Sequence, residues 1–295
     1  MSPETWLREH AVRGAEVLSW VNPEHPGYAY PEAAGLLVRW LALRGLPVPD
    51  AVVGALSRSV LADTVGRAGL VYAFDTAVVL TGLEALDTEE DPRWTHARRR
   101  LCEMDIVRPL APPRWSTVAG PHMLKLAVGC LARARRGWST PMLPMLQRWT
   151  VQQDADGRLN TPPHETTYLH AHAYAAEGLL ALRQLGSDRV GSVDGAIDFL
   201  RSMQRDDGSL PAWSHGGPGR ADTTAQAVRL FVLHDRTAHA AAIERGLAFL
   251  DTLTDAHGAV RYAPESADRN TWCTLFTAQA RAWASGATAR TEELL

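Results

Sequence analysis

Cysteine is scarce in this sequence, and long apolar runs are missing. The three cysteines, Cys102, Cys130 and Cys273, are far apart and odd in number, and no Cys-x-x-Cys pair occurs. We therefore expect no disulfide framework, no structural zinc site and a reducing, cytoplasmic location. No run approaches the ~20 apolar residues of a membrane span. The N-terminus lacks a basic start followed by an apolar stretch, so we expect neither a membrane span nor a signal peptide.

An excess of one charge is also absent. The 30 Lys and Arg residues nearly balance the 33 Asp and Glu residues, which gives a formal net charge of −3. The basic runs 98–100 and 133–136 are short and lie on helical patterns, so we expect a small-molecule substrate and no nucleic-acid partner. The hydrophobic fraction of 46% is that of a globular protein. No internal boundary divides the chain, so residues 1–295 are expected to form one domain.

A repeat of about fifty residues is present in the second half of the chain. Three loops carry a tight-turn glycine after Asp or His, namely Gly157, Gly208 and Gly258. Their spacings are 208 − 157 = 51 and 258 − 208 = 50 residues. Glycine supplies the positive φ that such a turn needs. Each turn lies between a more amphipathic helix and a second helix that is apolar nearly all round, which is typical of a buried helix.

This plan extends through the whole chain and predicts six helix pairs. Six pairs with buried second helices favour a closed ring over an open stack, because an open stack would leave its end repeats uncovered. We therefore expect an all-α (α/α)6 toroid. The predicted outer helices span residues 5–20, 50–62, 91–103, 141–152, 192–204 and 240–253, and the inner helices span 33–43, 76–86, 122–134, 165–185, 222–233 and 271–284.

Residues 199–213, Phe-Leu-Arg-Ser-Met-Gln-Arg-Asp-Asp-Gly-Ser-Leu-Pro-Ala-Trp, resemble the Gln–Trp repeat of the squalene-cyclase-like superfamily of terpenoid cyclases and protein prenyltransferases. The resemblance implies the same toroid. It does not by itself imply an activity, since one fold carries many chemistries. The Asp-x-Asp-Asp motif of class II terpene cyclases does not occur in this sequence.

Two other toroid chemistries also lack their residues. Protein prenyltransferases hold zinc with an Asp-x-Cys pair and a later His, whereas here Asp268 and Cys273 are five apart and no histidine follows His257. Lanthionine cyclases need a Cys-His pair beside a further Cys, which is absent. Sugar epimerases, lyases and unsaturated-uronide hydrolases have a similar architecture and work with His, Tyr, Asp or Glu at the inner-helix ends. Those residue types are available here.

The candidate site is the mouth of the ring, where the inner helices begin. Helix N-termini there present free N–H groups and partial positive charge. The densest polar cluster is residues 164–174, and a His beside a Tyr or a carboxylate can move a proton at neutral pH. One helix face carries Glu165, Tyr168 and His172, and another carries His170, Tyr174 and Glu177. The alternative is that these side chains only cap the helix and satisfy one another in the packing.

Two more carboxylates, Glu32 and Asp75, begin inner helices and would form an acid/base pair if they converge. Asp222 has an alternative reading as a helix cap, and residues 214–220 are either a mobile lid or a surface loop. Arg269 and Trp272 suit a carboxylate and a sugar ring. The predicted catalytic residues are His164, Glu165, Tyr168, His172, Glu32 and Asp75, and the predicted substrate-binding residues are Tyr30, His122, His215, Asp222, Arg269 and Trp272.

We therefore expect an enzyme with a polar acid/base site that acts on a small sugar or sugar acid by epimerisation, elimination or hydrolysis, without a metal or another cofactor. A terpene cyclase or prenyl-group enzyme is the first alternative, and a non-catalytic binding toroid is the second. The lining of the central cavity distinguishes them. A polar lining favours the acid/base enzyme, and a deep aromatic pocket favours the terpene cyclase. A plugged axis favours the binding toroid. The oligomeric state is left open.

Overall fold

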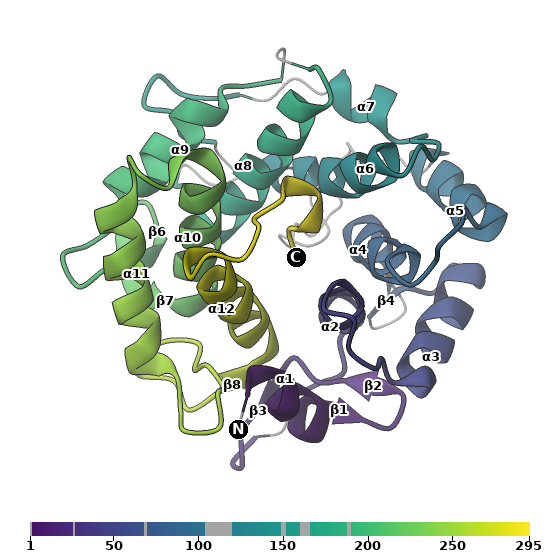
Figure 1. Ribbon diagram of the computed structural model, residues 1–295, viewed down its shortest axis with the longest axis horizontal. Helices are drawn as coiled ribbons and strands as arrows, with labels where there is room; N and C mark the ends of the chain where they lie inside the picture. The colour runs from purple at the N-terminus through teal and green to yellow at the C-terminus, as the bar shows by residue number, and fades with distance from the viewer. Residues whose placement is uncertain are drawn as a thin grey trace.

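The computed structural model describes residues 2–25, 27–67, 70–103, 120–148, 152–159, 166–187 and 190–295, and these form two concentric rings of helices (Figure 1). The inner ring contains α2 (Pro31–Leu43), α4 (Ala73–Glu84), η2 with α6 (Pro121–Lys125 and Leu126–Arg135), α8 (Leu169–Gln184), α10 (Ala221–Asp235) and α12 (Thr271–Ala284). The outer ring contains α1 with η1 (Pro3–Trp6 and Leu7–Ala11), α3 (Asp50–Leu61), α5 (Pro92–Glu103), α7 (Leu143–Gln147), α9 (Val193–Ser202) and α11 (Ala240–Leu253). The predicted (α/α)6 toroid is confirmed.

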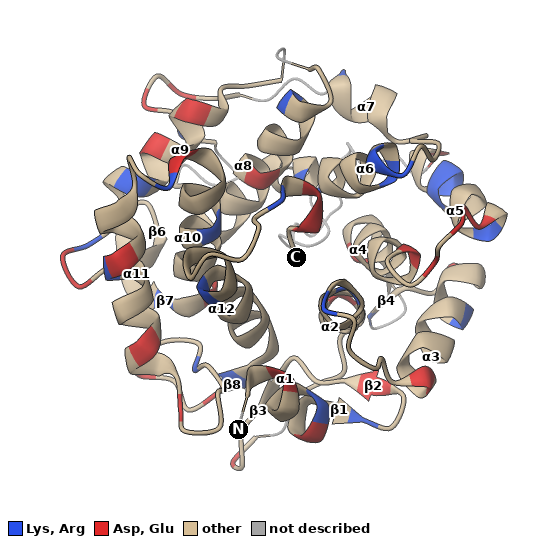
Figure 2. Cartoon of the chain, in the orientation of Figure 1, with Lys and Arg blue, Asp and Glu red and all other residues tan. Residues whose placement is uncertain are grey.

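Burial separates the two rings as the sequence pattern predicts. Every residue of α8 from Leu169 to Leu182 is buried, because inner helices on both sides and an outer helix behind surround it. In α9, by contrast, burial is confined to one stripe of apolar residues, and the opposite face is solvated. Charged residues of both signs are spread over the outer helices (Figure 2).

The ring is closed by a short antiparallel strand pair. Strand β3 (Trp20–Val21) pairs with β8 (Arg269–Asn270), which immediately precedes the last inner helix. The N–H of Thr271 donates to the carbonyl of Ser19 at 3.0 Å, and its hydroxyl donates to the carbonyl of Leu18 at 2.6 Å. The first and last repeats are therefore joined by main-chain hydrogen bonds.

This closure corrects the prediction of a helix over residues 5–20. Helical structure ends at Ala11, and β1 (Val12–Arg13) and β2 (Glu16–Val17) form a hairpin whose turn includes Gly14 at φ +61°. The chain must become extended here, because only an extended segment can pair with β8. The other hairpins are β4 (Gly66–Arg67) with β5 (Leu70–Val71) and β6 (Leu210–Trp213) with β7 (Gly216–Arg220).

The three turn glycines have the predicted positive φ, +87° at Gly157, +86° at Gly208 and +82° at Gly258. A Cβ on Gly157 or Gly208 would lie 2.0 Å from a main-chain oxygen of the next outer helix, α9 or α11. A Cβ on Gly258 would lie 2.8 Å from the nitrogen of Pro3 in α1. Each turn is thus docked on the following outer helix, and the last turn docks on the first helix of the chain.

The glutamine side chain of each repeat also connects the turn to the next outer helix. The amide of Gln153 donates at 2.9 Å to the carbonyls of Gly157 and Ser192, so it joins the turn to the start of α9. Gln204 makes the equivalent pair of contacts, to Gly208 at 3.1 Å and to α11 at 2.9 Å. The Gln and Gly positions of the repeat therefore stabilise the contact between neighbouring units.

We predict that Gly208→Ala lowers the free energy of unfolding by about 3 kcal/mol, because it adds steric overlap to the strain of a positive φ. Gly186→Ala is the matched control, since Gly186 has φ +77° and nothing lies within 4 Å of the added Cβ. The control should lose only about 1 kcal/mol. Urea denaturation of both variants measures the difference, and equal losses would contradict the docked-turn interpretation.

Candidate functional site

A cavity of about 250 Å³ opens at the mouth where the inner helices begin. Its wall is polar and aromatic, with three carboxylates and one histidine. The lining residues are Trp20, Tyr28, Tyr30, Glu32, Tyr168, His170, Asp222, Tyr262, Asp268, Asn270 and Trp272. This mixed lining is polar, as expected of an acid/base site, and is not a deep, purely aromatic pocket.

The repeat determines which positions reach the cavity. The second residue of four inner helices lines it, namely Glu32, His170, Asp222 and Trp272. The residue that precedes three of these helices also lines it, namely Tyr30, Tyr168 and Asn270. Six helix N-termini converge on this end of the ring, and their partial positive charge stabilises carboxylates there.

Glu32 is the most deeply placed carboxyl group of the wall, with 2% of its surface exposed. The hydroxyl of Tyr174 donates to it at 2.9 Å, and the side chain of Trp272 supplies a second hydrogen bond. Burial raises the pKa of Glu32 to about 7, although these two hydrogen bonds and the charge of Lys125 act in the opposite direction. Glu32 is therefore divided between its protonated and ionised forms near neutral pH.

Asp222 has the opposite shift in the same cavity. Its carboxylate accepts from Arg220 Nη2 at 2.9 Å and from the N–H of Thr223 at 2.8 Å, and His170 Nδ1 lies 3.6 Å away. Burial by itself raises the pKa of Asp222, but Arg220 and His170 outweigh it and the net shift is downward. Burial also lowers the pKa of His170. The site therefore holds an ionised carboxylate beside a neutral imidazole.

A continuous series of aromatic rings forms one side of the cavity. The ring centroids are 4.9 Å apart for Trp20 and Tyr28, 5.8 Å for Tyr28 and Tyr30, and 5.4 Å for Tyr30 and Trp272. Burial raises the pKa of Tyr168 to about 12, so its phenol stays protonated at neutral pH. Such a wall offers flat apolar faces together with hydroxyl and indole donors, which is the combination that binds a sugar ring.

Asp75 is completely buried and does not line the cavity. Burial raises its pKa well above the ordinary value, and the neighbouring Glu32 carboxylate raises it further. The two predicted carboxyl groups therefore interact electrostatically, but the structure brings only Glu32 to the cavity.

His172 also lies away from the cavity. Its Nδ1 accepts from the N–H of Leu159 at 3.2 Å, and its Nε2 bonds the carbonyl of Ala196 at 2.9 Å. In the next two repeats the same main-chain contact is made to the hydroxyls of Thr224 and Thr274. The position is thus a structural joint of each repeat, and burial lowers the pKa of His172 to about 4.

The remaining predicted residues divide as follows. Tyr30, Tyr168, Asp222 and Trp272 line the cavity as expected. His122 is buried against Phe74, with ring centroids 5.7 Å apart, and burial lowers its pKa to about 3. His215 is exposed between β6 and β7, and Arg269 pairs with Asp255 at 2.6 Å, so neither lines the cavity. His164 and Glu165 lie outside the described residues.

The structure separates the predicted residues at the start of α8. Tyr168 and His170 line the cavity and Tyr174 donates to Glu32, whereas His172 faces α9. Glu177, on the same helix face as His170 and Tyr174, is the sequence signal for the inward face, because a carboxylate in an otherwise apolar inner helix needs a buried partner. It pairs with Lys125, and with Arg229 at 2.7 Å.

Below the cavity the axis is filled. The amine of Lys125 donates to the carbonyl of Leu295 at 2.5 Å as well as to Glu177, and Arg229 donates to the same carbonyl at 3.3 Å. The last residues of the chain turn into the centre of the ring (Figure 1). The cavity is therefore open at the mouth and closed beneath it, so the filled axis expected of a binding toroid occurs together with the polar lining expected of an enzyme.

Among the described residues, no group of three or more His, Cys, Asp or Glu side chains is placed to hold a metal ion. None of the helices in the described ranges has the length and apolar character needed to cross a membrane.

Comparison with known proteins identifies the fold and no closer family. No family model matches the sequence, and no curated protein matches it. Among solved structures, ent-copalyl diphosphate synthase from Streptomyces platensis is similar at a TM-score of 0.55 with 21% identity, over 89% of this chain and 52% of that one. This chain thus spans about half the length of that synthase.

Other similar structures match nearly end to end. A wild-type glycosidase has a TM-score of 0.63 with 12% identity, over 96% of this chain and 95% of that one. A polysaccharide lyase has a TM-score of 0.62 with 12% identity, over 90% of this chain and 93% of that one. A glycosyl hydrolase of family 88 from Bacteroides vulgatus has a TM-score of 0.61 with 13% identity, over 95% of this chain and 99% of that one. At these identities the likeness shows the α/α toroid fold, as the Gln–Trp resemblance implies.

We predict that Glu32 makes stability fall as the pH rises. Its pKa of about 7 in the folded chain exceeds the ordinary 4.5, so the folded state binds this proton more tightly than the unfolded chain does. The free energy of unfolding therefore falls as the pH rises between these two values. From pH 5 to pH 8 the native chain should lose about 2–3 kcal/mol through this group, a loss that Glu32→Gln removes. Urea denaturation at both pH values tests this, with the exposed Glu16→Gln as control. Parallel pH dependence of the native chain and Glu32→Gln would refute it.

Proposed function

We propose that this chain is an enzyme that acts on a sugar ring by acid–base chemistry at the mouth of the toroid. The observation that carries the proposal is the opposite pKa shift of two carboxyl groups in one cavity, upward for Glu32 and downward for Asp222. Titratable groups whose environments push their pKa values apart are suited to complementary acid and base roles. Hydrolysis of a glycosidic bond uses such a pair of carboxyl groups.

In this proposal Glu32 exchanges the proton with the substrate. Its pKa of about 7 lets it donate a proton to a leaving oxygen and recover it at neutral pH. Tyr174 and Trp272 hold the carboxyl group by hydrogen bonds and so define its orientation. Asp222 stays ionised between Arg220 and His170, where it stabilises developing positive charge on the ring or activates water.

The charge of the wall favours a neutral sugar over a sugar acid. The lining contains Glu32, Asp222 and Asp268 and no lysine or arginine. Arg220 lies beside the cavity, but its guanidinium is committed to Asp222 and stacks on Tyr262 at 3.3 Å. A uronate would therefore meet like charge. The aromatic series and the small volume suit a single pyranose ring, and a long prenyl chain would need more room.

The similar structures support this reading. A glycosidase, a polysaccharide lyase and a family 88 glycosyl hydrolase share the fold over nearly their whole length. Elimination and epimerisation need the same kind of acid and base, so both stay within the proposal as reaction types to be tested.

A terpene cyclase is the second candidate, favoured by the similarity to the copalyl diphosphate synthase and by the aromatic wall. The absence of an Asp-x-Asp-Asp motif from the sequence opposes it.

The test is a turnover screen with aryl glycosides and disaccharides, unsaturated uronides and prenyl diphosphates. We expect hydrolysis of a neutral glycoside, with a pH optimum whose alkaline limb follows Glu32 near pH 7. Glu32→Gln and Asp222→Asn should each lower kcat by at least about 100-fold, the usual contribution of a general acid or base. Asp198→Asn is the matched control, because this carboxylate lies on the outer helix α9 with over half of its side chain exposed.

The other outcomes are distinguishable. Saturable sugar binding without turnover supports a binding toroid, and turnover of a prenyl diphosphate supports the second candidate. Preference for a uronide over the neutral sugar contradicts the charge argument. Full activity of Glu32→Gln removes Glu32 from the mechanism.

A further inference from the structure

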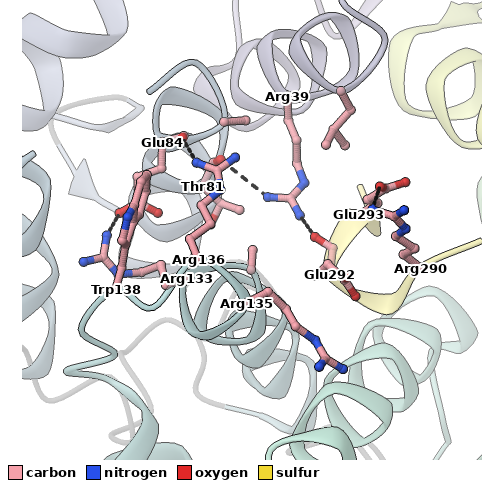
Figure 3. Close-up of a pocket in the computed structure, with 13 residues that line it drawn as sticks. Arg39, Thr81, Glu84, Arg133, Arg135, Arg136, Trp138, Arg290, Glu292 and Glu293 are labelled. Carbon is pink, nitrogen blue, oxygen red and sulfur yellow. Dashed lines mark hydrogen bonds and ion pairs between the residues drawn. The ribbon is translucent and has the colours of Figure 1, made fainter. Parts of the chain in front are cut away.

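A second cavity, of about 220 Å³, lies at the end of the ring opposite the mouth. It is formed where α2, α4 and α6 end and where the C-terminal segment, residues 286–295, crosses the ring (Figure 3). Its charged and aromatic lining residues are Arg39, Glu84, Arg133, Arg135, Arg136, Trp138, Arg290, Glu292 and Glu293. None of them belongs to the site at the mouth.

The lining carries an excess of positive charge. Five arginines and three glutamates give 5 − 3 = +2. The carboxylate of Glu84 pairs with Arg133 of the lining and also, at 2.6 Å, with Arg98, which is not in the lining. Figure 2 shows basic positions on α2 and α6 on either side of the C-terminal segment. Glu90, which is also outside the lining, pairs with Arg133, so these two outside charges offset each other and the excess of positive charge in the lining is unchanged.

Most of these arginines bind neutral acceptors. Arg136 donates to the carbonyls of Glu84 at 2.6 Å and Asp87 at 3.2 Å. Arg135 donates to the amide oxygen of Gln184 at 3.3 Å. Carbonyls at helix C-termini attract cations, but they do not neutralise them. Figure 3 shows the Arg135 side chain directed away from the guanidinium of Arg39, so of these two arginines Arg136 has its charge available to an anion in the cavity.

Arg39 is the least satisfied of the group. It is 3% exposed, and Figure 3 shows its guanidinium reaching from α2 between Thr81 and Glu292. Two of its nitrogens donate to the carbonyls of these residues, and within the described chain its Nε has no hydrogen-bond partner. The pKa of Arg39 is lowered to about 10, chiefly by burial; the charges of Arg136 and Arg98 act in the same direction, and those of Glu84 and Glu293 oppose it. A buried, incompletely satisfied cation costs free energy that an anion would recover.

We propose that this cavity binds a compact phosphate group, either free phosphate or the phosphate of a small ester, on Arg39 and Arg136. Guanidinium forks match the acceptor oxygens of phosphate and bind them with charge-assisted hydrogen bonds. The volume admits a small molecule, and the buried position of Arg39 excludes a flat macromolecular surface as its partner. Because Arg39 also holds the carbonyl of Glu292, the bound anion stabilises the C-terminal segment against the ring.

The test is calorimetric titration of the full chain with inorganic phosphate and with glucose 6-phosphate at constant ionic strength, together with thermal unfolding. We expect saturable binding and a rise in Tm that chloride at equal ionic strength does not reproduce. Tighter binding of the ester identifies a phosphorylated metabolite as the ligand, and equal binding identifies free phosphate.

Arg39→Lys keeps the charge and loses the fork, and it should weaken binding about tenfold. Because Arg39 is buried, Arg136→Gln provides a second variant at an exposed position, and it should also weaken binding. Arg58→Gln, an exposed arginine of α3, is the matched control and should bind like the native chain. Absence of saturable binding, or an equal loss in the Arg58→Gln control, overturns the proposal.

Discussion

The ring depends on the joint between its first and last repeats. Without the pairing of β3 with β8, the inner helices would form an open stack with exposed apolar ends. The same joint places Trp20 and Asn270 side by side in the wall of the cavity. Gly258, docked against Pro3, provides the matching contact in the outer ring. The strand pair that closes the ring therefore also forms part of the cavity wall.

Burial inside the closed ring sets the electrostatics of the mouth. Glu32 has hydrogen bonds from two neutral donors and only a smaller effect from the charge of Lys125, so burial dominates and its pKa rises. Asp222 is equally enclosed but has Arg220 at 2.9 Å, so the opposite charge dominates. Two carboxyl groups on equivalent positions of different repeats thus acquire different properties, because the side chains around them differ while the backbone geometry repeats.

The two ends of the ring have opposite charge preferences for one reason. All six inner helices begin at the mouth and end at the opposite face, so their dipoles place partial positive charge at the mouth and partial negative charge at the far end. Carboxylates gather at the mouth and arginines at the far end accordingly. At the far end five arginines and three glutamates line the cavity, and within the described residues the buried Nε of Arg39 has no hydrogen-bond partner.

The sequence alone determined the toroid, its six helix pairs and the turn glycines, because these follow from local periodicity and from backbone conformations that only glycine adopts readily. It also identified Glu32, Tyr30, Tyr168, Asp222 and Trp272, since a repeat places the starts of all inner helices at one end. Only the tertiary structure decided which face of α8 turns inward, that Asp75 stays behind the wall, and that residues 12–21 become extended. Those outcomes depend on neighbours more than a hundred residues away, such as Glu32 for Tyr174 and β8 for β3, whose positions no local pattern encodes.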